Sequence, residues 1–444
     1  MLPRCTALLI CAALWMPVLS AETWTLERAL ETALKNNAEL RASELSLRQA
    51  ERAARNSWNE FLPDISAQTG ISQSHTLAPN ASNTDTWNAS AGASLTFTAA
   101  IPGQMRRQQI AHEKAAAAHQ NALLQLTTGV SKTFYQLIAD RANIDILRAN
   151  QELTRRQYDQ VRRNYNNGLA SELDMLNAQY EYQRAGPTLS DALVKYRADV
   201  AAFLLILGLD PGDAAQGNTA EDFVGEGSIE ARKITLPAEA DIIVRYLDTR
   251  FDVRSQSLAI RNAQADAGVA LAPAAPSVRI AETFRLSPPA GAEHVAFDPL
   301  GYGGTFSITL NIPISPWIPG SSTNLAYRTA REALSQAQDI LGETRKAAVQ
   351  DIKKCMDEIQ RIGENMDVAA LNHRITGRAY TLSEQGYRNG LVSQTDLLAA
   401  NQRMVTAEQN ALNAKISYLK ALYDLAQALQ IDISELYSIS GDNT

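Results

Sequence analysis

The sequence has few cysteines and, beyond its first 21 residues, no long apolar run. Two of its three cysteines, Cys5 and Cys11, lie in that N-terminal stretch, which leaves Cys355 alone in the remaining chain. A single cysteine cannot form an intramolecular disulfide. The absence of a second apolar run of about 18 residues excludes a helical membrane protein. If the chain enters a membrane, it must do so as β-strands.

The usual sequence patterns of enzymes are also missing, so we expect no catalysis, no metal and no cofactor. The histidines do not have the spacing of metal ligands; they are His75, His112, His119, His294 and His373. No glycine-rich phosphate loop follows a strand, and Cys355 lacks the local sequence of a nucleophile. A net charge of −7 argues against nucleic acid as a partner.

Residues 1–21 have the pattern of a secretory signal peptide. Arg4 precedes the apolar run ALLICAALWM, and small residues follow up to Ala21. The alternative is a transmembrane anchor, but the apolar run is too short to span a bilayer. We therefore expect an exported protein that is cleaved near Ser20 or Ala21.

The chain contains an internal repeat. YNNGLASELDML at 165–176 returns as YRNGLVSQTDLL at 387–398, with seven of twelve residues identical, and ELRASELSLRQA at 39–50 aligns with DVRSQSLAIRNA at 252–263. The first pair of segments is 222 positions apart and the second pair is 213 positions apart. This difference of nine residues places an insertion within 313–322. A long-range repeat predicts a doubled architecture. We expect a first repeat at 22–211, an equatorial linker at 212–248, a second repeat at 249–432 and a tail at 433–444.

Each repeat is predicted to hold two strands, at about 64–75 and 87–99 and again at about 277–286 and 304–312. Their apolar residues alternate with polar ones, apart from Glu282 on an apolar position. This pattern fits either a half-buried soluble sheet or a barrel wall between lipid and water. Four strands cannot close a barrel and open edges do not persist in lipid, so several chains must pool their strands. Three chains would supply twelve.

Long helices are predicted at about 104–166 and 323–388, because these stretches lack proline and are rich in Ala, Gln, Leu and Glu. An apolar seam recurs every seven residues in the first of them; it consists of Leu123, Val130, Leu137 and Ile144. Shorter helices, at about 38–60, 171–208, 251–272 and 394–429, would stack end to end in pairs and match a long helix in length.

The repeated motif is typical of a helical hairpin. Gly168 and Gly390 suit the left-handed residue that ends a helix, and Ser171 and Ser393 can cap the helix that follows. Asp174 and Asp396 stand three residues after these serines, as in a capping box. Two interpretations stay open here: capping alone, or capping together with a ring of carboxylates in a symmetric oligomer.

The doubled Tyr-x-x-Gly-Leu-x-Ser-x-x-Asp-x-Leu motif, together with the helix–strand–strand–helix layout, resembles the TolC-like outer-membrane efflux proteins over nearly the whole chain. The resemblance implies a homotrimer in the outer membrane. Each chain would give four strands to a 12-stranded barrel and its helices to a long helical tunnel in the periplasm. Such a protein is the passive exit duct of a tripartite efflux or type I secretion system, with an adaptor protein and an inner-membrane pump as partners.

By the same resemblance, the tips form a closed entrance to the tunnel, and Asp396 matches an acidic position that lines it. We expect Asp174 and Asp396 to influence gating and cation passage. Ala399 stands where some members of the family carry a second acid, which weakens the expected carboxylate ring. The turns would contact the adaptor through eight residues, namely Tyr165, Gly168, Leu169, Ser171, Tyr387, Gly390, Leu391 and Ser393.

A periplasmic coiled-coil adaptor or scaffold is the alternative function, since it would also have long helices and a hairpin tip. It predicts a soluble sheet with no lipid-facing band, and usually one hairpin. The regular alternation at 87–99 and 304–312 favours the channel.

Overall fold

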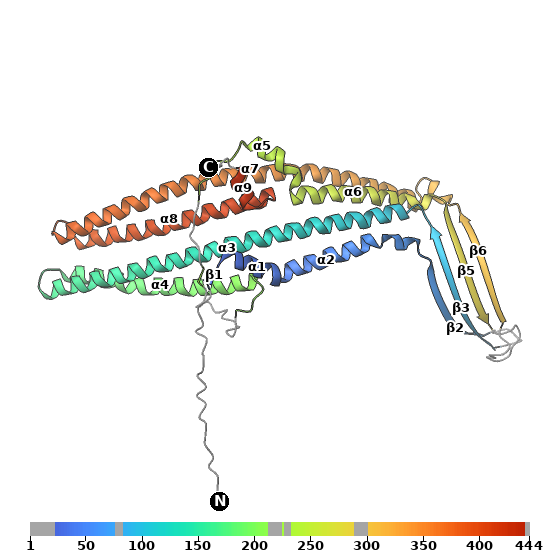
Figure 1. The fold of residues 1–444 in the computed structure, drawn as a ribbon, viewed down its shortest axis with the longest axis horizontal. Helices are drawn as coiled ribbons and strands as arrows, with labels where there is room; N and C mark the ends of the chain where they lie inside the picture. Colours follow the sequence, from blue (N-terminus) through green and yellow to red (C-terminus); the bar gives the residue numbers. More distant parts are fainter. Residues whose placement is uncertain (1–22, 76–82, 212–223, 226–231, 288–300, 440–444) are drawn as a thin grey trace, which may run out of the picture.

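The computed structural model of the 444-residue chain describes residues 23–75, 83–211, 224–225, 232–287 and 301–439. The predicted signal peptide and part of the predicted linker lie outside these residues. A bundle of long helices runs along the molecule, with a sheet at one end and two helical hairpin tips at the other (Figure 1). No helix in the described ranges is long and apolar enough to cross a bilayer.

The sheet consists of four antiparallel strands in the order β2-β3-β5-β6. Their bounds are β2 Asp64–His75, β3 Asn83–Phe97, β5 Ser277–Ser287 and β6 Gly301–Asn311. The two halves of the chain therefore meet at the β3–β5 pair, where Ala93 lies opposite Glu282. Strands β2 and β6 form the edges of the sheet, and each has only one strand partner among the described residues.

The strand register places apolar side chains on one face of the sheet. Ile71 pairs with Trp87, and Leu95 pairs with Ile280, which in turn pairs with Ile308. The residues between them occupy the opposite face because successive side chains alternate; they include Ser90, Thr96, Arg279 and Thr309. One face is thus apolar across all four strands, apart from Glu282, and the other is polar.

The sheet continues into two long helices, α3 Ile101–Asn166 and α7 Ser322–Arg388. At about 1.5 Å per residue each is about 100 Å long. Between and beside them lie four shorter helices that stack in pairs; these are α2 Ala38–Arg55 with α4 Glu172–Ile206, and α6 Phe251–Leu271 with α8 Gln394–Leu429 (Figure 1).

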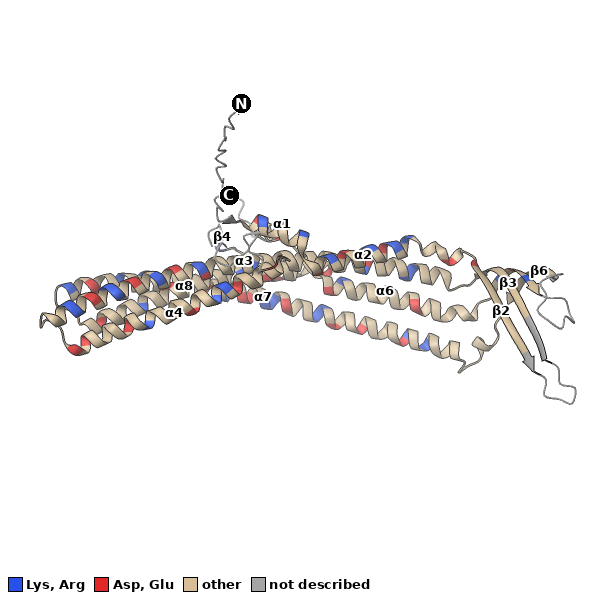
Figure 2. Cartoon of the chain, turned by 90° about the horizontal axis from the view of Figure 1, so that it is seen from below, with Lys and Arg blue, Asp and Glu red and all other residues tan. Residues whose placement is uncertain are grey.

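Side-chain hydrogen bonds hold the ends of the shorter helices at the middle of the bundle. Asn37 begins α2 by accepting from the Leu40 amide, and its own amide nitrogen donates to the carbonyl of Ile206 in α4 at 3.0 Å. At the second joint, Gln430 follows α8 and donates to Asn121 of α3 at 3.0 Å. Acidic and basic residues are interspersed along all these helices, with no long stretch of one sign (Figure 2).

Short elements cover the joints, and several of them complete apolar clusters with the long helices. They are β1 Thr23–Trp24, α1 Leu26–Asn36, β4 Val224–Gly225, α5 Glu239–Tyr246 and α9 Ile433–Ile439. One apolar cluster joins α1 and β1 to Phe134 of α3 and Phe203 of α4. A second joins α5 and α9 to Ile352 of α7 and Leu422 of α8.

Several details differ from the expectations. The stretch 38–60 is not one helix, because α2 ends at Arg55 and a 3-10 helix, η1 Ser57–Phe61, follows it. The segment expected to be a tail contains α9, whose Leu436 is buried in the second cluster. Leu123 is exposed although Val130, Leu137 and Ile144 of the same predicted seam are buried, because the first apolar cluster begins only near Leu126.

Candidate gating and docking site at the helical tips

The two helical turns at the end of the bundle have the same backbone structure. Gly168 and Gly390 adopt φ values of +74° and +72°, the left-handed region that favours glycine. The amide of Leu169 donates to the carbonyl of Asn164 at 2.8 Å, and the amide of Leu391 donates to Gly386 at 2.8 Å. These bonds define a Schellman motif, which ends α3 and α7 at equivalent positions. The side chains of Leu169 and Leu391 are left exposed on the turns.

The serines that follow the turns cap the next helices. The hydroxyl of Ser171 accepts from the Asp174 amide at 3.1 Å, and the Ser171 amide donates back to the Asp174 carboxylate at 3.3 Å. This is a complete capping box. In the second tip the Asp396 amide donates to Ser393 at 3.1 Å, and the Ser393 hydroxyl donates to the Asp396 carboxylate at 2.7 Å. The Asp174 carboxylate therefore caps a backbone N–H, whereas the Asp396 carboxylate holds the hydroxyl of the capping Ser393.

The structure brings parts of the two motifs together. Tyr387, at the end of α7, is partly buried against Asn164 of α3, and the Asp174 carboxylate lies near its hydroxyl. Burial raises the pKa of Tyr387, the Asn164 side chain opposes this rise by hydrogen bonding, and the charge of Asp174 adds to it. Tyr165, the equivalent tyrosine of the first tip, is exposed, as is Asp396. The two repeats thus have equivalent backbones in unequal surroundings.

A stripe of amide side chains on α3 was not predicted from the sequence. Its members recur every seven residues and face α8 or α7; they are Gln136, Asn143, Asn150, Gln157 and Asn164, here called the amide stripe. Lys420 donates to Gln136 at 2.6 Å, Gln409 to Asn143 at 2.8 Å, and Asn401 to Asn150 at 3.0 Å, all from α8. Closer to the tip, Gln157 and Asn164 lie beside the α7 tyrosines Tyr380 and Tyr387 and oppose the rise that burial causes in their pKa.

The amide stripe lies between the α3–α4 and α7–α8 hairpins, and the contacts between these hairpins change along the bundle. The α3–α4 and α7–α8 hairpins have apolar clusters near the middle of the bundle, and a small apolar cluster with Ala139 and Leu419 joins α3 to α8 there. From Asn143 to the tip, the side-chain hydrogen bonds that the described residues make between the hairpins come from amides. Such neutral bonds contribute only about 1 kcal/mol each in net stability. The seam is therefore weaker toward the tip.

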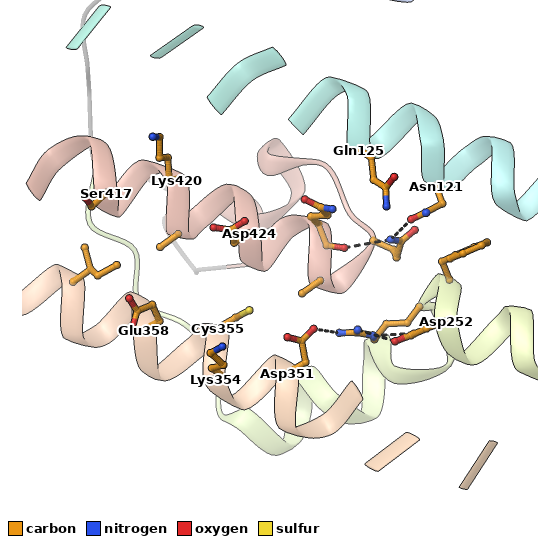
Figure 3. A pocket seen from close by; sticks show the side chains of 17 residues that line it. Asn121, Gln125, Asp252, Asp351, Lys354, Cys355, Glu358, Ser417, Lys420 and Asp424 are labelled. Carbon is orange, nitrogen blue, oxygen red and sulfur yellow. Dashed lines mark hydrogen bonds and ion pairs between the residues drawn. The ribbon is translucent and has the colours of Figure 1, made fainter. Parts of the chain in front are cut away.

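A groove of about 780 Å³ lies at the joint between α6 and α8 (Figure 3). It contains Cys355, whose pKa is raised mainly by burial. All four acids that line it are paired with bases: Asp252 and Asp351 with Arg250, Glu358 with Arg361, and Asp424 with Lys132. Arg250 thus links the start of α6 to α7, and Lys132 links α3 to α8, whereas Glu358 and Arg361 pair within α7. Within the described residues, no three potential metal ligands gather at one place.

The combination of a four-stranded sheet, a long helical bundle and paired helical tips defines a class of bacterial outer-membrane channels. The model of the family described as "Outer membrane efflux protein" matches residues 29–209 and 242–429, and the chain belongs to this family. It is similar to the toluene efflux pump outer membrane protein TtgC of Pseudomonas putida. The two are 23% identical over 418 residues, which are 91% of this chain and 82% of the relative.

Solved structures show the same fold. The Campylobacter jejuni CmeC outer membrane channel has a TM-score of 0.76 at 18% identity, and the alignment covers 94% of this chain and 89% of that one. The outer membrane protein VceC of Vibrio cholerae has a TM-score of 0.73 at 18% identity, covering 92% and 96%. The resemblance, the fold class and the outer-membrane location expected from the sequence are confirmed. The chain is an outer-membrane efflux channel, and the adaptor alternative is not favoured.

Proposed function

We propose that three copies of this chain form one passive exit duct, which an adaptor protein couples to an inner-membrane pump. The open edges β2 and β6 support this assembly, because a sheet in lipid must satisfy its edge hydrogen bonds. Single-chain barrels begin at eight strands, whereas three copies of this sheet supply twelve. The duct carries out no chemistry of its own. Its doubled layout reflects the two repeats, 22–211 and 249–432, on either side of the equatorial linker.

The tips form the closed periplasmic entrance of this duct. The observation that carries the proposal is the amide stripe, because it makes the seam between the hairpins polar toward the tip while both hairpins keep apolar contacts near the middle. One hairpin can then move against the other without either of them unfolding. Opening breaks a few bonds of about 1 kcal/mol each, an amount that adaptor binding can supply.

The exposed turns are the docking surface for the adaptor. Leu169 and Leu391 are 78% and 81% exposed, on rigid glycine-ended turns that differ little from each other. A repeated adaptor tip would find two sites of the same backbone structure on each chain. Tyr165, Gly168 and Ser171 of the first turn, with their counterparts Tyr387, Gly390 and Ser393, shape these two sites. Asp174 and Asp396 place two carboxylates per chain beside the entrance, where they favour cations.

A reversible crosslink across the amide stripe tests the gate. In a Cys355→Ser background, Asn150→Cys and Asn401→Cys are combined and bridged with a short bis-methanethiosulfonate, which forms one disulfide with each thiol, releases sulfinate and is cleaved by a reductant. The channel in a planar bilayer should stop opening when bridged and recover after cleavage of the bridge. Each single-cysteine variant, treated in the same way, is the control. Openings that continue unchanged in the fully bridged protein would contradict the proposed gate.

A further inference from the structure

One buried side chain near the second tip has no partner for either of its polar atoms. Gln394 is the first residue of α8 and is only 5% exposed. Within the described residues, neither its amide nitrogen nor its amide oxygen makes a hydrogen bond. Because nearly all buried polar groups in native proteins are hydrogen-bonded, this exception requires an explanation.

The buried face of α8 that carries Gln394 is turned toward α3. Gln394, Leu397 and Asn401 are all buried, and their spacing of three and four residues places them on one face of the helix. From this face Asn401 donates to Asn150 of α3. Gln394 therefore belongs to the seam between the two hairpins.

The antiparallel register of α3 and α8 places Gln394 opposite Gln157, a member of the amide stripe. The bond between Asn150 and Asn401 fixes this register. Seven residues closer to the tip, α3 carries Gln157 and α8 carries Gln394. The Gln157 oxygen is also buried and has no hydrogen-bond partner among the described residues. The direct amide bond at Asn150 is thus not repeated at Gln157.

Neither helix capping nor the internal repeat accounts for a buried amide here. The capping contacts of α8 are made by Ser393 and Asp396, without Gln394. In the first repeat Glu172 follows Ser171 as Gln394 follows Ser393, and Glu172 is exposed. The buried amide is therefore a feature of the second tip and of its packing against α3.

A buried amide without a partner destabilises the state that buries it. Breaking a hydrogen bond that is already made costs little net free energy, because water replaces the lost partner. A polar group that is buried without a partner instead loses its hydration and gains nothing in return. When the α7–α8 hairpin moves away from α3, Gln394 regains water. Burial of Gln394 therefore favours the open tip, whereas the bond from Asn401 favours the closed one.

We propose that Gln394 is the point at which the closed seam first parts, and that opening proceeds from there toward Asn401. The proposal rests on the gate proposed above. Gln394 lies three residues after Leu391, the exposed leucine of the second turn. An adaptor that binds this turn acts directly beside the least stable part of the seam.

An apolar side chain of equal length tests the role of the buried amide. Gln394→Met keeps the length and flexibility of the side chain and removes both polar atoms. We expect the open fraction in planar bilayers to fall at least about fivefold, both in the unaltered chain and in the Asn401→Ala background. Gln402→Met makes the same chemical change at an exposed position of α8 and should leave the open fraction unchanged.

Thermal unfolding of the purified protein gives a second measurement that does not depend on conductance. Gln394→Met and the branched variant Gln394→Leu should unfold at the same temperature as the unaltered chain or at a higher one, because neither buries an unpaired amide. A clear loss of stability in both variants would show that the amide has a stabilising partner. That result would overturn the proposal.

The conductance results separate this proposal from the gate itself. An open fraction that is unchanged or raised by Gln394→Met would show that the amide is already satisfied in the closed seam, by water or by Gln157, and would overturn the proposal. If Asn401→Ala still raises the open fraction, the gate stands. If Asn401→Ala has no effect either, the gate fails and the role of Gln394 fails with it.

Discussion

The side-chain amide of Asn401 on α8 donates to the Asn150 oxygen on α3 at 3.0 Å, and Asn401 is only 4% exposed. These two residues are 251 positions apart and belong to different hairpins. A buried amide pair at this place holds the hairpins in register without the strength of an apolar core. The proposed opening of the channel must break this pair.

Removing this amide should favour the open channel. Asn401→Ala deletes the bond to Asn150 and leaves the Asn150 oxygen without its donor. This should destabilise the closed state by about 1–3 kcal/mol. The open fraction in planar bilayers should rise at least about fivefold, because 1 kcal/mol corresponds to that factor.

Gln402→Ala is the matched control, since Gln402 is exposed at the next position of the same helix. It should leave the open fraction unchanged. An equal rise in both variants would show that the effect comes from general loosening of α8 and not from the amide pair.

Neutralising the tip carboxylates should reduce cation preference. The double variant Asp174→Asn, Asp396→Asn keeps an oxygen that can accept the capping bonds of Ser171 and Ser393, so the helices should remain folded. Reversal potentials in a salt gradient should shift toward lower cation selectivity, and block by divalent cations should weaken. Asp191→Asn, an exposed acid further along α4, should change neither property.

Two glycines with the same backbone conformation should differ sharply in their tolerance of a side chain. Gly168 and Gly208 have φ values of +74° and +75°, but a Cβ on Gly168 meets nothing within 4 Å, whereas one on Gly208 would lie 2.5 Å from the Asn36 carbonyl oxygen. Gly168→Ala should cost about 1–2 kcal/mol, the strain of the left-handed region alone. Gly208→Ala adds a backbone clash of about 1–3 kcal/mol. Thermal unfolding should show the larger loss for Gly208→Ala, and equal losses would contradict this account.

Alkaline pH should weaken the contact between α3 and α8 through Tyr423. Burial raises the pKa of Tyr423 to about 12 from its ordinary value of 10.0. Because the folded-state pKa is the higher one, the stabilisation is complete below pH 10 and is lost as the pH rises to about 12. Two pKa units correspond to about 3 kcal/mol at most.

Tyr423→Phe should therefore flatten the stability curve between pH 10 and about 12, as measured by denaturant unfolding at several pH values. Tyr180→Phe alters an exposed tyrosine on α4 and should leave that curve as it is. A curve for Tyr423→Phe that still falls as steeply as that of the unaltered chain would show that other groups control the alkaline transition.

Much of the fold was predictable because the patterns that specify it are local. The alternation of apolar and polar residues along 87–99 and 304–312 identified strands. The Gly-x-x-Ser spacing identified the two helical turns at Gly168 and Gly390. The amide stripe escaped prediction although its spacing of seven residues is visible in the sequence. Polar residues beside an apolar seam are indistinguishable from a solvated face until their partners on α8 and α7, such as Gln409 and Tyr380, are known.

The short covering elements escaped prediction for a different reason. Helices α1, α5 and α9 have at most 11 residues, which is too short for a decisive periodicity. Their positions depend on distant contacts, such as the bond from the Tyr246 hydroxyl of α5 to the Glu435 carboxylate of α9 at 3.3 Å. The inequality of the two tips, with Tyr387 packed and Tyr165 exposed, likewise arises from the way the two repeats meet.

The most direct test of the channel account is the conductance of the detergent-purified protein in a planar bilayer, with its mass determined on the same sample. The account predicts the mass of three chains and long-lived channel openings. A protein that stays monomeric, or a trimer that never conducts even with Asn401→Ala in the seam, would contradict the exit duct.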